Sequence, residues 1–534
     1  MTKPMTAVIA VLMAGMAFAE PRTVVWSGGG TGGWSDPANW ESDPPVAGDT
    51  AEIPTGKTAT LAAAADFKLA NSLAEIKLSA ADAKLLVANT AYANLSVRVT
   101  GTGLFWVENN AQNLDLTGDN TGFTGPFTFV GSQVYVRNNK ALGVSNVVTN
   151  SPKTNGRLEI DKAGMYGNTL YLNSSGSNTA NDYYCEADNV TNTGPVYVTG
   201  AARILGPAGF SGFGFVTFAG GFSHKGAGYA RIIKKVRLIG DTPCVFGSTE
   251  NYNRGGIMAM ESAVLEIGAP VSITGLKRIA SFDGTVRFIK ENVMPSLADG
   301  QTDRGTLAFG NASASDTKGG TIDLNGCSQT IWDFAKDPSN PTGAQILTSA
   351  TPATLTVCGT FYRYGDYNWK NNESKNADIQ LEGAVSYELN SKQTGWSGRW
   401  QQGHGHTYFT KRTSTTTGFL SVKCGTLSLG ADTTWTKLSE LRVSGSSASL
   451  IVNTSAVNPG RVIVKIGSTG TLTLGTGVLL DARKAVVGDT YLEPGVYGGP
   501  DAGLDAAHTL ASLKGTGLLK VRLPEHPGLM LLFK

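Results

Sequence analysis

Charge is scarce in this sequence and is evenly divided between the two signs. Only 16% of the 534 residues are Asp, Glu, Lys or Arg, and 44 basic against 42 acidic side chains give a formal net charge of +2. That balance produces no net field that would attract nucleic acid or an anionic membrane surface. The densest basic cluster, RIIKKVR at Arg231–Arg237, is most simply a strand whose cations lie in water, and a binding patch is the alternative interpretation.

Cysteine and histidine are also rare, with five residues of each. The cysteines show no C-x-x-C pair and no metal-ligand spacing, and no disulfide can be assigned to a particular pair. Cys424, in LSVKCGTLSL, fits the common use of a lone cysteine as a small buried hydrophobic residue. His404 and His406 would point the same way on a strand and could share a metal, but a solvent-facing turn is the simpler interpretation. We therefore expect no metal and no other cofactor.

Long helical periodicity is missing as well. The candidate helices are short, at Ala62–Leu69 and Leu504–Leu513. A hydrophobic fraction of 41% is enough for a large core, while 67 glycines against 21 prolines and many Thr and Val residues favour an all-β protein.

The sequence contains instead many short alternating runs separated by polar turns. In LDLTGDNTGFTGPFTFVGSQVYVRNNKALG (Leu114–Gly143), the runs Leu114–Leu116, Phe127–Val130 and Val134–Val136 alternate as strands with one buried face do. The turns between them use Gly and Asn, whose backbones reach positive φ at little cost. Similar runs return roughly every 10 to 25 residues from about Ala59 to Val486, a spacing close to that of solenoid repeats.

This pattern resembles the autotransporter-associated β-strand repeat of bacterial secreted and surface proteins. The resemblance is most specific at Leu114–Gly143, at GTIDLNGCSQTI (Gly320–Ile331) and from Thr417 to Leu429. It implies a right-handed parallel β-helix, so we predict an all-β solenoid with a cap at each end. We expect no translocator barrel after the repeats, because too little chain follows them.

The N-terminal segment has the features of a secretory signal peptide. Residues 1–19 combine Lys3, an apolar run and the small-x-small end Ala17-Phe18-Ala19. They predict a mature chain from Glu20 that is secreted to the outside or the cell surface of a bacterium, without a membrane span after cleavage.

The mature chain divides into three expected parts. Residues 20–58 place Trp26, Trp34 and Trp40 among Gly and Pro turns, which suits a cap over the first coil, with sugar stacking as the alternative use of the rings. Residues 59–486 are assigned to the solenoid, and residues 487–534 to a C-terminal cap and tail.

No group of residues typical of a catalytic centre stands out. Parallel β-helix lyases and hydrolases need carboxylates grouped on one face, often with Arg or Lys. Asp323, Asp366 and Glu382 are candidates, but nothing in the sequence groups them. We therefore expect a structural or adhesive β-helix protein that is not an enzyme. The alternative is a β-helix that binds or degrades polysaccharide through an aromatic groove.

An aromatic-rich region is the best candidate for such a groove. Aromatic rings stack on the C–H faces of sugars while polar neighbours bond the hydroxyl groups. Two stretches would form one groove if they fell on neighbouring coils, and the alternative is that their rings pack over a bulge or a side loop. The candidate glycan contacts are Phe361, Tyr362, Tyr364, Tyr367, Trp369, Trp396, Arg399, Trp400, His404, His406 and Tyr408. The expected partners are extracellular polysaccharide or other surface proteins, and not nucleic acid.

Overall fold

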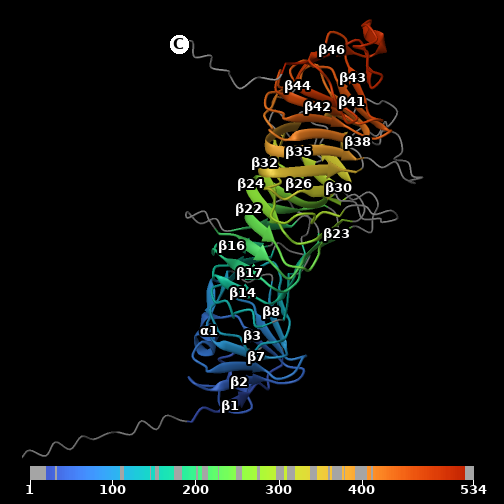
Figure 1. Cartoon of the computed structure of the whole chain (residues 1–534). Helices are drawn as coiled ribbons and strands as arrows, with labels where there is room; N and C mark the ends of the chain where they lie inside the picture. The colour runs from blue at the N-terminus through green and yellow to red at the C-terminus, as the bar shows by residue number, and fades with distance from the viewer. Residues whose placement is uncertain are drawn as a thin grey trace, which may run out of the picture.

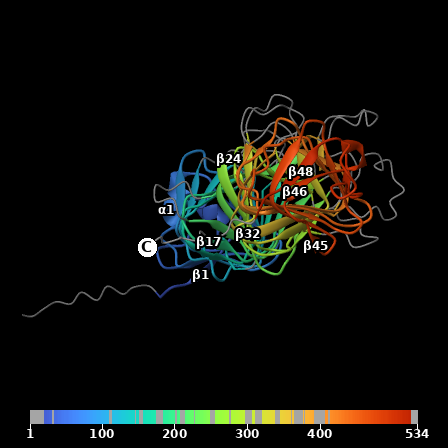
Figure 2. The ribbon, with the colours of Figure 1, turned by 45° about the horizontal axis from the view of Figure 1, so that its top comes forward.

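The chain folds as an elongated stack of parallel β-coils, a β-solenoid of about 14 turns (Figure 1). The computed structural model describes residues 20–523, with the exception of 30–32, 109–112, 145, 151–155, 174–182, 200–201, 207–213, 226–227, 248–254, 274–276, 296–305, 310–318, 337–344, 359–360, 364–375, 378, 391–405 and 410–412. The predicted fold class is confirmed. Figure 2, in which the C-terminal end comes toward the viewer, shows successive coils lying one behind another.

Alternation of apolar and polar residues turns one side of each strand inward. In β11 (Gln133–Val136), Val134 and Val136 are buried while Gln133 and Tyr135 lie toward solvent. Because neighbouring strands pair in register, buried residues stack on buried residues: Val134 pairs with Leu114 on one side and Leu158 on the other. The result is one hydrophobic core that runs the length of the described solenoid.

The N-terminal coils have three parallel faces. The first is β1 (Thr23–Val25), β2 (Thr50–Ile53), β4 (Glu75–Leu78) and β7 (Arg98–Gly101). The second, here called the ten-stranded sheet, is β3 (Thr58–Leu61), β5 (Lys84–Val87), β8 (Leu104–Val107), β10 (Phe127–Phe129), β12 (Val147–Asn150), β15 (Thr169–Asn173), β18 (Val196–Thr199), β21 (Phe222–Lys225), β23 (Cys244–Gly247) and β25 (Val271–Ile273). The third begins with β6 (Ala93–Leu95), β9 (Leu114–Leu116), β11, β13 (Arg157–Ile160), β16 (Tyr183–Cys185) and β19 (Arg203–Leu205).

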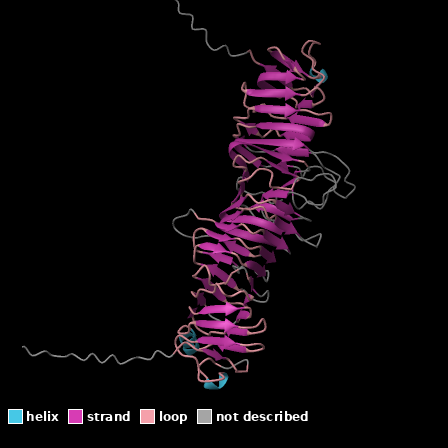
Figure 3. Cartoon of the chain, turned by 60° about the horizontal axis from the view of Figure 1, so that its bottom comes forward, coloured by secondary structure: helices cyan, strands magenta, loops and turns pink. Residues whose placement is uncertain are grey.

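Long strands replace pairs of short ones in the middle of the chain. β22 (Gly228–Leu238) pairs through Arg231–Ile233 with β19 and through Val236–Leu238 with β20 (Val216–Phe218). β20 in turn pairs with β17 (Val190–Asn192), and β17 pairs with β14 (Gly164–Tyr166). A bulge at Lys234, with φ of 71°, separates the two halves. The axis of the stack shifts sideways in this region (Figure 3). The basic cluster of the sequence thus lies on one strand, where Lys234 is exposed and the two arginines are half-buried.

The C-terminal half continues the same stacking. Its strands are β24 (Gly255–Ile267), β26 (Lys277–Ser281), β27 (Thr285–Phe288), β28 (Thr306–Phe309), β29 (Gly320–Asp323), β30 (Gln329–Ile331), β31 (Asp333–Lys336), β32 (Gln345–Val357), β33 (Phe361–Arg363), β34 (Asn376–Ala377), β35 (Ile379–Asn390), β36 (His406–Phe409), β37 (Thr413–Ser414), β38 (Phe419–Leu429), β39 (Thr434–Trp435), β40 (Glu440–Val443), β41 (Ala448–Val452), β42 (Val462–Ile466), β43 (Thr471–Leu474), β44 (Leu479–Val487), β45 (Thr490–Tyr491), β46 (Gly495–Gly498), β47 (Leu513–Lys514) and β48 (Leu518–Val521). At the end of the stack, β45 and β46 pair antiparallel with β44 and β48.

Three tryptophans fill the opposite end. Trp26, Trp34 and Trp40 are buried, and their ring centroids lie 4.9 to 5.9 Å apart. The indole Nε1 of Trp40 donates to the Trp34 carbonyl oxygen at 3.0 Å. Because buried rings offer no free face, packing is their use here and stacking on sugar is not.

Helices are few. α1 (Ala64–Ala70) confirms the expected helix at Ala62–Leu69. The second expected helix, Leu504–Leu513, is wrong: a short 3-10 helix, η2 (Pro500–Ala502), precedes it, and the segment itself forms turns that lead into β47. Another 3-10 turn, η1 (Pro37–Asn39), lies between the tryptophans. Among the described residues, no helix has the length and apolar character needed to cross a membrane.

Candidate functional site

The aromatic region predicted from sequence falls largely outside the described residues, which exclude Tyr364, Tyr367, Trp369, Trp396, Arg399, Trp400 and His404. The backbone of Phe361 and Tyr362 belongs to β33, and that of His406 and Tyr408 to β36. β33 lies beside β34, and β34 pairs in parallel with β36. The described strands of the two stretches, β33 and β36, are therefore both next to β34. Contact between a glycan and the aromatic rings of these stretches remains a prediction.

Of the three carboxylates considered as catalytic candidates, the structure describes two, and each of these has its own hydrogen-bond partner. Asp366 lies outside the described residues. Asp323 on β29 accepts from Arg287 Nε at 2.9 Å, and Glu382 on β35 accepts from Gln380 Nε2 at 2.6 Å. Asp323 and Glu382 occupy the same column of the sheet, with Thr348 of β32 between them.

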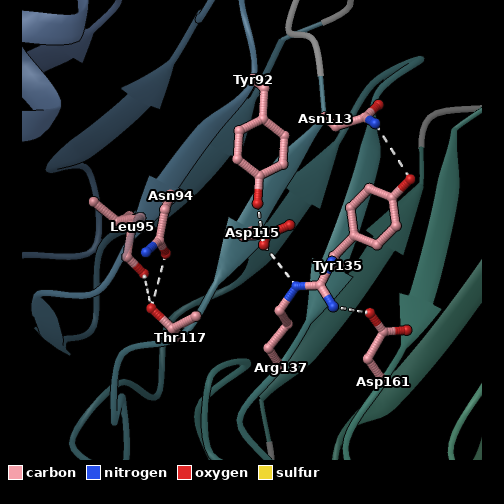
Figure 4. A network of polar contacts seen from close by, with 9 residues as sticks. All are labelled: Tyr92, Asn94, Leu95, Asn113, Asp115, Thr117, Tyr135, Arg137 and Asp161. Carbon is pink, nitrogen blue, oxygen red and sulfur yellow. Dashed lines mark hydrogen bonds and ion pairs between the residues drawn. The ribbon is translucent and has the colours of Figure 1, made fainter.

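A denser polar network, which we call the charged face, lies on the outer side of β6, β9, β11, β13 and β16 (Figure 4). Arg137, just after β11, joins two neighbouring coils: its Nε donates to Asp115 Oδ2 and its Nη1 donates to Asp161 Oδ2, each at 2.6 Å. The hydroxyl of Tyr92 also donates to Asp115 Oδ2. These contacts raise the pKa of both Arg137 and Tyr92, in each case mainly through the hydrogen bond to Asp115.

Tyrosine rings and amides border these charges. Asn113 Nδ2 donates to the Tyr135 hydroxyl at 3.3 Å, and Thr117 Oγ1 donates to Asn94 Oδ1 at 2.8 Å (Figure 4). The Arg137 guanidinium lies 5.2 Å from the centre of the Tyr135 ring, within the range of a cation–π contact. Partial burial raises the pKa of Tyr135.

Three carboxylates meet at one edge of the charged face. Oxygens of Glu159, Asp161 and Glu186 lie within 4.8 Å of one another. Glu159 is only 2% exposed and forms an ion pair with Arg157, whose guanidinium lies 4.1 Å from the Tyr184 ring centre. Burial, which penalises the ionised form, raises the pKa of Glu159 to about 7 and also raises that of Asp161.

These oxygens are of the kind that Ca²⁺ prefers, and a carboxyl with a pKa near 7 suits proton transfer. Arg137 and Arg157 already balance much of the negative charge, however, and the carboxyl with the raised pKa is buried. In the described part of the chain, Oδ1 of Asp115 and of Asp161 has no hydrogen-bond partner, so each carboxylate is bonded through Oδ2 alone. The arrangement serves coil-to-coil pairing better than ion binding.

The sequence signal for this network is the alignment of similar segments on successive coils, which alternation within a single strand does not reveal. The segments LDLT, VYVR and LEID, which begin at Leu114, Val134 and Leu158, pair in register on β9, β11 and β13. Their second and fourth residues point away from the apolar core and include the Asp, Tyr, Arg and Glu side chains of the network, of which Asp115 and Glu159 are buried. These columns become visible only when successive coils are aligned by their buried residues.

Cys185, Cys244, Cys327 and Cys424 are free thiols. Burial raises the pKa of both Cys185 and Cys244 to about 12, so these two behave as small core residues. The expectation for Cys424 is wrong: it is partly exposed on β38, with its Sγ 3.2 Å from Ser447 Oγ. It lies between the two buried runs of that strand, Leu420–Val422 and Leu427–Leu429.

Comparison with known proteins adds no relative. No family model, no curated protein and no solved structure matches this chain.

Proposed function

We propose that this protein is a secreted structural or adhesive rod at the cell surface or in the extracellular matrix of a bacterium. The supporting observation is that outward charges are paired from coil to coil along the axis. Arg237 Nε contacts Glu266 Oε2 at 2.6 Å, and Arg287 contacts Glu266 at 3.6 Å and Asp323 at 2.9 Å. Connected ion pairs of this kind add to backbone ladders that already run along the axis, which makes a stiff stack.

The assignment of the coils to the autotransporter-associated β-strand repeat belongs to this proposal. It rests on the three sequence segments that resemble the repeat and on the stacking of parallel coils in the structure. The signal peptide, which lies outside the described residues, supports secretion. Rods of this type present long faces to partners, and function is inferred here from architecture.

The test is where the protein resides in the bacterium that produces it. Antibodies against the mature chain should detect it in the envelope and extracellular matrix fractions, with an N-terminus at Glu20. Purified mature chain added to washed envelopes or matrix should sediment with them, whereas heat-unfolded chain serves as the control. A protein found only in the cytoplasm, with its first 19 residues intact, would contradict the proposal.

A second candidate, polysaccharide degradation, is favoured by one observation: Glu159, Asp161 and Glu186 lie together beside two arginines. Paired carboxylates with separated pKa values are the acid and base of many glycosidases. Polysaccharide degradation would be supported if the mature chain released new reducing ends or unsaturated ends from polysaccharides. This release should be lost in both Glu159→Gln and Asp161→Asn and kept in the exposed control Asp119→Asn. The burial of Glu159 is why we rank it second.

A further inference from the structure

Two tyrosines stack on the outside of the ten-stranded sheet. Tyr171 in β15 pairs in register with Tyr197 in β18, their ring centroids lie 4.8 Å apart, and the ring planes differ by 16°. The flanking leucines and valines of both strands are buried, so alternation places the tyrosines outside. Tyr171 is 38% exposed. Within the described part of the chain, neither ring hydroxyl has a hydrogen-bond partner.

The described strands around this pair carry little charge. The strands β10, β12, β15 and β18 read FTF, VVTN, TLYLN and VYVT and contain no Asp, Glu, Lys or Arg. The next strand, β21, ends in the exposed Lys225, which pairs in register with Thr199. On the same coils, each of the strands β9, β11 and β13 either contains or directly precedes a charged residue of the charged face. Over the described residues of these coils, the solenoid thus has one charged face and one face with no charged residue on β10, β12, β15 or β18, which we call the neutral face.

Polar groups that can bond sugar hydroxyls line the neutral face. Thr199 Oγ1 donates to Asn173 Oδ1 at 2.9 Å, and Asn173 Nδ2 donates to the Asn150 carbonyl at 2.9 Å. This ladder fixes amide and hydroxyl groups beside the two rings. Such a mixture of ring faces, amides and hydroxyls is the chemistry that recognises carbohydrate.

Small neighbours leave room beside both rings. Tyr171 is followed in its column by Thr149 of β12 on one side, and Tyr197 by Ser223 of β21 on the other. One face of each ring is therefore bordered by a short side chain instead of another ring. Strands are spaced by about 4.8 Å, so Thr149 and Ser223 are roughly 14 Å apart. A ligand that uses both ring faces must be longer than one sugar unit.

We propose that this neutral face, centred on Tyr171 and Tyr197, binds an uncharged polysaccharide, with sugar rings stacked against the outer faces of the two tyrosines. The scarcity of charge argues for a neutral partner, because an anionic polymer would find no cation on β10, β12, β15 or β18 and only Lys225 on the adjoining β21. The inference rests on the proposed adhesive role and names the chemical class of what the rod adheres to.

Affinity electrophoresis of the mature chain through gels containing neutral β-glucan, mannan or xylan tests this inference, with alginate as the anionic comparison. We expect at least one neutral polymer to retard the protein, and added salt to have little effect. The double variant Tyr171→Ala/Tyr197→Ala should bind about tenfold or more weakly, since two stacking surfaces are lost. Tyr491→Ala, which removes an exposed tyrosine near the C-terminal end, should bind as the parent does.

Several outcomes would overturn the inference. These are no retardation by any neutral polymer, retardation by alginate alone, or undiminished binding by the double variant when its circular dichroism and melting temperature are unchanged. A dimer seen by light scattering in the parent and lost in the double variant would show that a second copy occupies the face. Adhesion to envelopes that survives the double variant would overturn the inference and leave the proposed function intact, while absence of adhesion in the parent would contradict the proposed function.

Discussion

The guanidinium of Arg137 donates to the carboxylate of Asp161 on the next coil at 2.6 Å. It also contacts Asp115, whose side chain is only 7% exposed, on the preceding coil. Arg137→Ala would leave two mostly buried carboxylates without this cation, so we expect the free energy of unfolding to fall by about 1–3 kcal/mol. The control Lys140→Ala breaks an exposed pair with Asp119 and should cost less than about 0.5 kcal/mol. Urea unfolding of both variants checks this, and equal effects would contradict it.

The raised pKa of Glu159 makes stability depend on pH. Its folded pKa of about 7 lies above the ordinary value of 4.5, so between these values the folded chain holds a proton that the unfolded chain has lost. The free energy of unfolding therefore falls as pH rises through this window, by on the order of 1–3 kcal/mol, and Asp161 acts in the same direction.

Glu159→Gln keeps the neutral form at every pH. Melting temperatures of variant and parent should be similar near pH 5, and the variant should become the more stable of the two near pH 8. The exposed Glu41→Gln serves as the control and should follow the parent. A constant difference between Glu159→Gln and the parent from pH 5 to pH 8 would show that Glu159 does not titrate in this range.

Gly101 stands where the chain turns closely against the previous coil. Its φ is +95°, and a Cβ there would overlap the carbonyl oxygen of Leu78. Gly477 has a φ of +75° with open space around its Cβ position. Gly477→Ala should therefore cost only the left-handed strain of about 1–2 kcal/mol, and Gly101→Ala clearly more. Thermal unfolding of the two variants separates the clash from the strain, and the prediction fails if they melt alike.

Trp34 has no exposed surface at the N-terminal end of the stack. Trp34→Ala should cost about 3–5 kcal/mol by leaving a cavity between Trp26 and Trp40. In a solenoid each coil contacts only its neighbours, so the loss should be local. Hydrogen exchange should become faster in β1, β2 and β4 and stay unchanged in β41 to β43. The half-buried Trp106 provides the control variant, Trp106→Ala, which should have a smaller effect.

Local signals predicted the architecture well and the surface poorly. Alternation in runs such as Leu114–Leu116 is a property of each strand by itself, so it could be read from sequence. The columns of outward residues depend on register between coils whose lengths vary: Arg137 contacts residues 22 and 24 positions away. Without that register, Asp115, Arg137 and Asp161 are three unrelated charges, and Tyr171 and Tyr197 are two unrelated rings.

Two local predictions failed for identifiable reasons. LDAAHTLASL has good helix formers, but Thr509 Oγ1 bonds to the Leu504 and Asp505 carbonyls, and His508 bonds to Asp505, which holds the segment in turns. For Cys424, the apolar residues on both sides of it in LSVKCGTLSL predict burial. The register shift between Leu389 and Asn390 on the paired strand turns this part of β38 outward. In the first case local side-chain hydrogen bonds overrode helix propensity, and in the second case pairing with the neighbouring strand overrode the local pattern.

The in-register stacking of coils also gives the molecule a way to change in evolution. A strand such as β11 meets the same kind of strand above and below it, so the duplication or deletion of one coil would leave the two end structures and the outer columns intact. Such an event changes length by one step of about 4.8 Å and leaves the cross-section unchanged. The length of the rod can therefore change in evolution only by whole coils.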